Sequence, residues 1–307
     1  MTQTDAAVPE NQGSGELAAA LSETKTDPEL RASRPHALTD RQASAMTAES
    51  RATVVVLAGG VASGKTTLIA SLYERFAHGP IAGRRFAGSQ TLPGFEARAQ
   101  GLRPLLGAAQ SMPHTHRNAV PWLHVRVALA SEQPQDLLLG DFDGEVFDRV
   151  IEGKDAPDSV PALRRADHVA VVLDGQALVE ASRRSHARQR SVDLIEVLAQ
   201  ERVLAASSVL SLVVTKLDLL NRAPRDARVA ARGVVAELRT RLIERAAVRE
   251  PAVIETAAIS SVPDLPLGHG LDELLDHWHR RPATVVGPSE APEVPHAYGQ
   301  WFGRFAS

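Results

Sequence analysis

The sequence contains no cysteine, which excludes a disulfide framework and any metal site built on thiolates. The same lack is compatible with the reducing cytosol, where we expect the protein to be. No apolar run approaches the roughly 20 residues that a helix needs to cross a bilayer. The first residues, MTQTDAAVPENQGSGEL, have neither the basic region nor the apolar stretch of a signal peptide.

Basic charge is not in excess, since the 307 residues carry a net charge of −3. We therefore expect no nucleic acid and no anionic membrane as a partner. Lysine is rare, because only four of the 34 basic residues are lysine, namely Lys25, Lys65, Lys154 and Lys216. A lysine that falls at a motif position consequently carries weight. The 44% hydrophobic content suits one sizeable core with tails rather than two full domains.

Composition divides the chain into three parts. Residues 1–50 are rich in Ala, Thr, Ser, Glu and Pro without a sustained apolar period, and we expect a disordered tail there. Residues 51–281 are expected to form one domain. Residues 282–307 start as a Pro-rich linker and end in AYGQWFGRFA, whose aromatic side chains have helical spacing. This aromatic segment either docks on its own domain or anchors the chain in a groove of a partner.

Short β-branched runs alternate with helical patterns between residues 52 and 280. This alternation predicts an α/β fold, with a mainly parallel sheet covered by helices on both faces. The segment 78–121 is long and irregular for a connection, which favours a functional or disordered loop. The predicted strands are 53–58, 122–129, 136–141, 168–174, 208–215 and 252–258, and the predicted helices are 66–76, 181–202, 225–249 and 270–280.

The stretch GGVASGKTT fits the pattern G-x-x-x-x-G-K-[ST] and lies between a predicted strand and a predicted helix. Its glycines let backbone N–H groups face a phosphate, and the helix N-terminus adds partial positive charge. Lys65 can reach the β- and γ-phosphates, while the Thr66 hydroxyl can bind Mg²⁺. The alternative is a Gly-rich turn that happens to precede a helix. The predicted nucleotide-binding residues here are Gly59, Gly60, Val61, Ala62, Ser63, Gly64, Lys65, Thr66 and Thr67.

A D-x-x-G pattern, Asp-Phe-Asp-Gly, begins at Asp141, which closes a predicted apolar strand. A carboxylate at this strand end can hold Mg²⁺, usually through water. The N–H of Gly144 can contact a γ-phosphate, and glycine also permits the rearrangement that a nucleotide switch needs. The ordinary alternative is an Asp-Gly turn.

The stretch LVVTKLDLL places a [NT]-K-x-D pattern, Thr215 to Asp218, at the end of a predicted strand. A fixed carboxylate at Asp218 can accept from both N1–H and the exocyclic amine of guanine. Adenine offers neither donor, so an unpaired Asp218 would penalise ATP. Lys216 can lay its aliphatic stem along the base plane. An exposed Lys/Asp turn is the alternative reading.

The stretch ETAAIS, residues 255–260, follows the last predicted strand. It resembles the E-T-S-A-K loop, whose backbone N–H groups contact the guanine carbonyl. Ala257 and Ala258 stand where that pattern has Ser-Ala, and Ile259 replaces the lysine. The stretch is equally consistent with a plain turn.

In this order and spacing, the four motifs resemble a GTPase of the translation-factor and Ras-like class over about residues 52–281. The resemblance implies a three-layer P-loop domain, GTP or GDP as the ligand and Mg²⁺ as the cofactor. Three stretches resemble more narrowly the second type of the bacterial double-GTPase family, namely FAGSQTLPGFEAR, GDFDGEVF and RRADHVAVVLDG. That resemblance implies a second GTPase as partner, in a bacterial conflict or signalling system.

The resemblance also implies catalytic positions beside Lys65. Glu145 stands where Ras-like enzymes carry a water-orienting glutamine, and it lacks the amide donor, so we expect slow hydrolysis without an activating partner. A switch threonine that binds Mg²⁺ should precede the strand at 122–129, and Thr115 is the first candidate, with Thr91 the second. None of the arginines in this region is assigned a role: Arg84, Arg85, Arg98, Arg103 and Arg117.

The sequence is consistent with three hypotheses of function. The first is a slow regulatory GTPase that acts as a switch with a protein partner. The second is a module that binds GTP and hydrolyses it very little, which Glu145 favours. The third is a P-loop ATPase or kinase, which the phosphate loop alone would allow and which the pattern at Thr215–Asp218 opposes.

Overall fold

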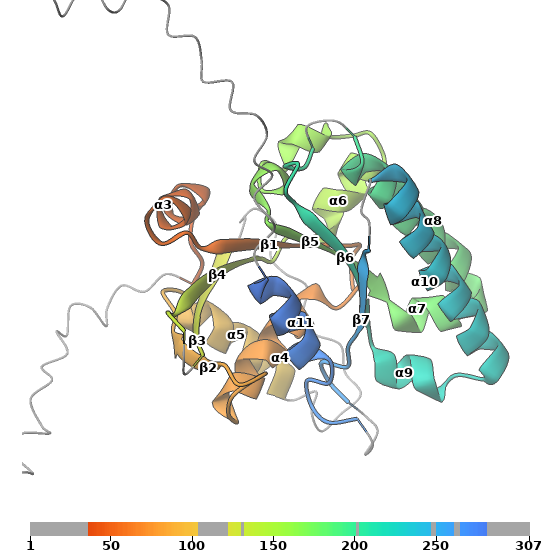
Figure 1. Cartoon of the computed structure of the whole chain (residues 1–307). Helices are drawn as coiled ribbons and strands as arrows, with labels where there is room; N and C mark the ends of the chain where they lie inside the picture. Colours follow the sequence, from red (N-terminus) through yellow and green to blue (C-terminus); the bar gives the residue numbers. More distant parts are fainter. Residues whose placement is uncertain are drawn as a thin grey trace, which may run out of the picture.

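The computed structural model describes residues 36–103, 122–129, 132–200, 203–246, 250–260 and 265–280. Within them, a seven-stranded sheet has the order β2-β3-β4-β1-β5-β6-β7 (Figure 1). Strands β1 and β4 to β7 are parallel, whereas β2 and β3 join the β4 edge as antiparallel strands. The strands are β1 (Thr53–Ala58), β2 (Arg85–Gly88), β3 (Trp122–Ala128), β4 (Gln135–Gly140), β5 (His168–Asp174), β6 (Val209–Thr215) and β7 (Ala252–Glu255).

Helices cover both faces of the sheet, so the fold is a three-layer α/β domain with a mainly parallel sheet, as the sequence predicts (Figure 1). One face is covered by α4 (Lys65–Ala77), α5 (Leu92–Leu102) and α11 (Leu271–His279). Against the other face lie α3 (Asp40–Ser50), α6 (Gly144–Ile151), α7 (Gly175–Val179), α8 (Ala181–Leu198), α9 (Leu217–Arg222) and α10 (Arg225–Arg245).

The alternation of side chains along β1 explains why both faces are apolar. Val54 and Val56 pack in the core cluster with α8 and α10, whereas Val55 and Leu57 pack in the cluster with α4 and α11. All six residues of β1 are buried. A strand buried on both sides reads as a continuous apolar run, which is why TVVVLA could be recognised as a central strand.

Helix α3 lies inside the range that the sequence predicts to be disordered, so this prediction is wrong for residues 40–50. A capping box starts the helix, because the Thr39 side chain accepts from the Gln42 N–H and the Gln42 side chain accepts from the Thr39 N–H. Ala43 and Met46 are buried, and Trp122 Nε1 donates to Asp40 Oδ1 at 2.7 Å. The tail therefore contributes one packed helix to the core.

The segment 78–121 is also less irregular than its composition suggests. It holds the edge strand β2 and the helix α5, while residues 104–121 lie outside the described part of the chain. Tyr73 of α4 stacks on Phe95 of α5 with ring centroids 5.5 Å apart. Helix α5 is thereby fixed beside α4, the helix that follows the Gly-rich loop.

The ends of the later elements shift slightly from the predicted ones. β7 stops at Glu255 rather than continuing to 258, because Ala257 forms an isolated bridge with His269 instead of extending the ladder. Helix α8 ends at Leu198 and α10 at Arg245, earlier than the apolar pattern predicts. The C-terminal segment 282–307 lies outside the described residues.

Candidate functional site

The loop of residues 59–64 joins β1 to α4 at the carboxyl end of the parallel strands. Gly64 has a φ of 95°, a left-handed conformation that favours glycine, and a Cβ there would lie 3.3 Å from the Thr215 side chain. A Cβ on Gly59 would lie 2.8 Å from the Val172 carbonyl oxygen. These glycines let the loop lie directly on the ends of β5 and β6.

The remaining loop residues differ in exposure. Val61 and Ala62 are exposed, and Ala62 has a φ of 60°. Ser63 is buried, and its Oγ has no hydrogen-bond partner among the described residues. Buried hydroxyls nearly always have a partner, so an unpaired one fits a loop that a ligand completes.

Lys65 folds back over its own loop. Its Nζ donates to the carbonyl oxygens of Gly59 at 2.8 Å and Gly60 at 2.9 Å. Burial lowers the pKa of Lys65 to about 8, although the carboxylates of Asp141, Asp143 and Asp148 act in the opposite direction. Three carboxylates therefore lie near the Lys65 ammonium group. Phosphate oxygens could replace the two carbonyl oxygens as its hydrogen-bond acceptors.

Thr66 and Asp141 meet beside this lysine. The Thr66 Oγ1 donates to Asp141 Oδ1 at 2.9 Å, although 75 residues separate the two in the chain. The Asp141 side chain is fully buried, and Arg98 Nε of α5 donates to its other oxygen, Oδ2, at 2.8 Å. A hydroxyl and a carboxylate are the oxygen ligands that Mg²⁺ prefers, so this donor set fits the ion.

The D-x-x-G segment packs directly on the Gly-rich loop. Gly144 begins α6, and a Cβ on it would lie 2.3 Å from the Val61 nitrogen. The Asp143 side chain caps the helix by accepting from the Glu145 N–H at 3.2 Å. Glu145 itself is exposed in the first turn. Only glycine at 144 permits this contact between the two segments.

A second group of predicted residues lies at the ends of β5 and β6. Thr215 Oγ1 donates to the Ser63 carbonyl at 2.7 Å, so it ties the strand to the Gly-rich loop. Lys216 has a φ of 54°, and its Nζ donates to Asp174 Oδ2 at 2.9 Å. Asp174 in turn accepts from the N–H groups of Gln176 and Ala177 and thereby caps α7.

Asp218 and the loop after β7 complete this side. Asp218 lies in the first turn of α9 with 5% of its surface exposed. The Leu217 N–H donates to the Thr256 carbonyl at 3.0 Å, which holds the loop of Ala257 and Ala258 beside α9. The Ala257 N–H donates to the His269 carbonyl at 3.0 Å. A contact of Ala257 with a ligand would have to replace that bond.

Of the two candidate switch threonines, the structure describes Thr91. Thr115 lies outside the described residues. Thr91 is fully buried, and its Oγ1 accepts from the His124 N–H at 2.9 Å, which attaches the start of α5 to β3. In this conformation Thr91 has a packing role. Thr67 follows Thr66 in the first turn of α4 and is half-buried.

Sequence reasoning missed three charged residues of the site. Asp174 ends the strand at 168–174 and precedes a glycine, the same kind of signal that drew attention to Asp141. Asp148 of α6 forms an ion pair with Arg190, and its negative charge acts to raise the pKa of Lys65. Arg98 has no such signal, because 34 basic residues less four lysines leave 30 arginines in the chain.

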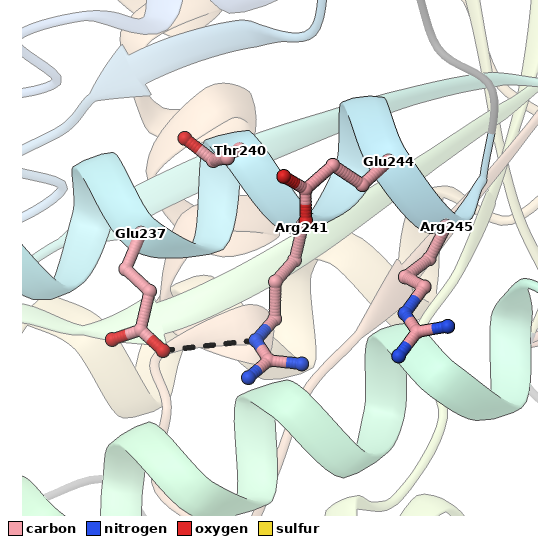
Figure 2. A pocket seen from close by; sticks show the side chains of 5 residues that line it. All are labelled: Glu237, Thr240, Arg241, Glu244 and Arg245. Atoms are coloured by element: carbon pink, nitrogen blue, oxygen red, sulfur yellow. Dashed lines mark ion pairs between the residues drawn. The ribbon is translucent and has the colours of Figure 1, made fainter.

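A shallow hollow of about 580 Å³ lies away from this site, on the last turns of α10 (Figure 2). Its lining includes Glu237 and Arg241, which form an ion pair at 3.6 Å. Helix α10 runs from the carboxyl edge of β6 back to the start of β7, so the hollow lies at the opposite edge of the sheet from the Gly-rich loop. We assign it no ligand.

Among the described residues, no three His, Cys, Asp or Glu side chains are grouped so that they could hold a metal ion. No helix within the same ranges is long and apolar enough to cross a membrane.

Several solved structures share features of this fold. Translation elongation factor SelB from Methanococcus maripaludis, in complex with the GTP analogue GppNHp, is 14% identical, with a TM-score of 0.38 over 74% of this chain and 32% of that one. The chain thus spans about a third of that factor. The signal recognition particle receptor SRb-GTP/SRX complex from Chaetomium thermophilum is 18% identical, with a TM-score of 0.39 over 69% and 93%. The S. cerevisiae Ski7 GTPase-like domain, bound to GDP and inorganic phosphate, is 16% identical, with a TM-score of 0.43 over 76% and 51%.

A comparison with curated proteins gave no match. A profile of the Double-GTPase 2 family, in contrast, matches residues 53–279, which run from β1 to the end of α11. This range includes the Gly-rich loop, Asp141, Gly144 and the pattern that ends at Asp218. The chain therefore belongs to the Double-GTPase 2 family, within the P-loop GTPases of the translation-factor and Ras-like class, and is a GTP-binding protein.

Proposed function

We propose that this protein is a slow regulatory GTPase, which converts GTP and water to GDP and phosphate with Mg²⁺ and switches its contacts with a protein partner. The observation that carries the proposal is the hydrogen bond between Thr66 and Asp141. It brings the hydroxyl of the phosphate loop to the carboxylate of the D-x-x-G segment, beside Lys65. The chemistry of a magnesium–phosphate site needs these three groups together.

The phosphates of GTP would lie on the loop of residues 59–64, at the N-terminus of α4. Lys65 would exchange the carbonyls of Gly59 and Gly60 for β- and γ-phosphate oxygens. Thr66 and Asp141 would hold Mg²⁺, with Thr115 proposed as a further ligand. When bound, the ion neutralises negative charge on the phosphates as the terminal bond breaks.

The guanine base would lie between Lys216 and the loop of Ala258, with its N1–H and amine groups facing Asp218. Thr215 supports this arrangement indirectly, since its hydroxyl joins the Gly-rich loop to the strand that carries Lys216 and Asp218. The buried position of Asp218 supports selectivity, because a desolvated carboxylate strongly disfavours a base without donors.

In hydrolysis, a water molecule attacks the γ-phosphorus, and the bond from that phosphorus to the β–γ bridging oxygen breaks. The bridging oxygen stays with GDP, and the protons of the water end on inorganic phosphate or in solvent. Glu145 is the residue proposed to orient the water. It is exposed at the start of α6, and its carboxylate can only accept hydrogen bonds, which supports a slow intrinsic rate.

Gly144 supports the switching part of the proposal. A Cβ on Gly144 would lie 2.3 Å from the Val61 nitrogen and 2.4 Å from the Gly60 carbonyl carbon, so no side chain would fit there. A γ-phosphate on the loop would approach the same place, so the start of α6 would move between the GTP and GDP states. Residues that follow α6 would then present a different surface to a partner.

A second GTPase of a bacterial conflict or signalling system, in the cytosol, is the partner that we propose from the resemblance of three sequence stretches. The alternative of a binding module with very little hydrolysis is favoured by one observation, the glutamate at position 145. The two functions differ in the effect of the partner on the hydrolysis rate.

The first test is equilibrium binding of fluorescent GTP, GDP and ATP to the full chain with Mg²⁺. We expect micromolar or tighter binding of both guanine nucleotides, with ATP at least about 100-fold weaker. Preferential binding of ATP would contradict the proposal.

The second test is single-turnover hydrolysis of GTP with and without the partner. We expect a rate on the order of 10⁻⁴ s⁻¹ alone, as for an unassisted Ras-type enzyme, and a large acceleration by the partner. A fast unassisted rate would contradict the regulatory proposal, and no hydrolysis with the partner would favour the binding module.

A further inference from the structure

Arg98 occupies a position that the proposed reaction does not use. It lies in the middle of α5, and only 14% of its side chain is exposed. Its Nε donates to Asp141 Oδ2 at 2.8 Å, and its NH1 group donates to the Gly94 carbonyl at 2.9 Å. Two nitrogens of the guanidinium thus donate to acceptors within the protein, and one of these acceptors is the carboxylate proposed to hold Mg²⁺.

Asp141 needs a positive neighbour because its side chain is fully buried. Removing a charge from water is costly unless an opposite charge and hydrogen bonds replace the water. Among the ion pairs of the described residues, Arg98 supplies the one on Asp141, while Thr66 occupies the other oxygen. Among the described residues, the Arg98 guanidinium is therefore the cation bonded to Asp141, and the Lys65 ammonium group lies nearby.

An ion bound at Thr66 and Asp141 would lie beside the Arg98 guanidinium and repel it, in a buried place where water screens little. The two cations would use different oxygens of the carboxylate, Oδ1 and Oδ2, and still share its negative charge. We therefore expect binding of the ion to weaken the pair between Arg98 and Asp141. The pair in turn must lower the affinity of the site for the ion, since the two effects are linked.

We propose that Arg98 is an internal counter-ion that competes with Mg²⁺ for Asp141, and that its release reports the metal-bound state to helix α5. This inference rests on the proposed binding of Mg²⁺ with a guanine nucleotide. Helix α5 is well placed to respond. Its Phe95 stacks on Tyr73 of α4, and a Cβ on its Gly94 would lie 1.8 Å from the His36 carbonyl oxygen. A shift of Arg98 would thus be felt at α4 and at the segment before α3.

The test measures how Mg²⁺ slows the release of fluorescent GDP from the full chain. Wild type, Arg98→Gln and Arg103→Gln are titrated with Mg²⁺ from an EDTA-buffered start. Arg103 is the matched control, because it also borders α5 and pairs with carboxylates, those of Glu74 and Glu96, away from Asp141. We expect Arg98→Gln to lower the half-effective Mg²⁺ concentration about tenfold, whereas Arg103→Gln leaves it unchanged.

A thermal measurement keeps the proposal testable if the variant is unstable without ligand. The gain in melting temperature on adding Mg²⁺ to the GDP complex should be larger for Arg98→Gln than for wild type. Arg98→Lys, which keeps the charge and loses the guanidinium geometry, should fall between the two. A merely structural arginine would lower both melting temperatures equally and leave the gain unchanged, which would overturn the inference.

The remaining outcomes separate this inference from the proposed function. If wild type itself shows no response to Mg²⁺, both fail. If wild type responds and Arg98→Gln has the same or a higher half-effective concentration, only the counter-ion role fails. A large loss of hydrolysis rate at saturating Mg²⁺, with an unchanged half-effective concentration, would also overturn it, because Arg98 would then act on the phosphate.

Discussion

The two halves of the site differ in how their polar groups are satisfied without a ligand. On the base side, Thr215 and Thr256 are bonded to main-chain atoms of neighbouring strands and loops. On the phosphate side, Lys65 and Asp141 are bonded to groups that a ligand would replace or displace. Thr215 and Thr256 on the base side can therefore keep their bonds when a base binds, whereas Lys65 and Asp141 on the phosphate side would exchange theirs.

We infer from this difference that the two halves of the site have separate functions, base selection and response to the ligand. A rigid acceptor discriminates between bases, because a wrong base leaves a buried group unpaired. The phosphate side responds to its ligand, since the bonds of Lys65 and Asp141 to the ligand would replace bonds within the protein. The comparison predicts that base-side changes alter selectivity and that phosphate-side changes alter coupling to Mg²⁺, pH and the γ-phosphate.

The largest effect is expected from Asp218→Asn on the base side. One acceptor becomes a donor, so the ratio of GTP affinity to xanthosine triphosphate affinity should fall by at least about 1,000-fold. Competition binding against a fluorescent guanine nucleotide measures this ratio. Asp226→Asn, a change of an exposed carboxylate in the first turn of α10, is the matched control and should leave the ratio unchanged. An unaltered ratio in Asp218→Asn would remove Asp218 from the base site.

Gly144→Ala should separate the two nucleotide states on the phosphate side. A Cβ at this place would lie 2.3 Å from the Val61 nitrogen, so α6 would be pushed away from the loop. We expect about 30-fold weaker binding of GTPγS with little change for GDP, which corresponds to roughly 2 kcal/mol of overpacking. Gly233→Ala serves as control, because nothing lies within 4 Å of its Cβ position. Equal loss for both nucleotides would show that Gly144 does not sense the γ-phosphate.

The pKa of Lys65 predicts a pH dependence that the base side should lack. The free protein loses the Lys65 proton above pH of about 8, whereas a bound phosphate would hold that proton. Nucleotide affinity should therefore fall up to about tenfold per pH unit above 8. Lys65→Met should bind weakly at every pH and show no such slope. A wild-type affinity that is flat from pH 7 to 9 would contradict the prediction.

The same pKa predicts that, without added nucleotide, the stability of the folded protein rises with pH. The folded-state pKa of about 8 lies below the ordinary lysine value of 10.5, so the unfolded chain binds more protons between these two pH values. The free energy of unfolding should therefore rise with pH, by about 2 kcal/mol between pH 8 and pH 10 relative to Lys65→Met. Urea denaturation of both proteins at pH 8 and pH 10 measures the difference.

The smallest effect is expected where the two halves are joined. Thr215→Val removes the hydroxyl that donates to the Ser63 carbonyl, which should cost about 1 kcal/mol of stability and weaken GTP and GDP alike by a few fold. Urea denaturation and nucleotide binding measure the two effects. Thr240→Val, on the exposed side of α10, should change neither. A loss of base selectivity in Thr215→Val would show that the halves are less separate than proposed.

The fold could be predicted from sequence because its signals are local. The run TVVVLA is apolar after its first residue, and the Gly-rich loop with Lys65 and Thr66 follows it directly. Helix α3 was missed because its apolar face is narrow, with Ala43 and Met46 as its buried residues. Its capping box, Thr39 to Gln42, was the available signal, and the contact of Asp40 with Trp122 needed the folded chain.

The residues of the site likewise divide into those with a local sequence signal and those without one. Lys65, Asp141 and Asp218 stand out because each belongs to a short motif with a known spacing that begins at or directly after the end of a predicted strand. The partners of these residues do not, since Arg98 is 43 positions from Asp141 and Asp174 is 42 from Lys216. Such pairs depend on which strands become neighbours in the sheet. The burial that shifts the pKa of Lys65 is likewise a property of the assembled layers.

The position of Trp122 bears on the intrinsic fluorescence of the protein. Its ring meets that of Phe142 edge to face, with centroids 5.7 Å apart, and Phe142 is the residue directly after Asp141. Its indole N–H donates to Asp40, so one chromophore touches both α3 and the D-x-x-G segment. Indole emission depends on the groups around the ring, and any displacement of Phe142 alters them. We therefore expect the emission of Trp122 in the unmodified chain to change with the bound nucleotide, if the proposed switch displaces Phe142.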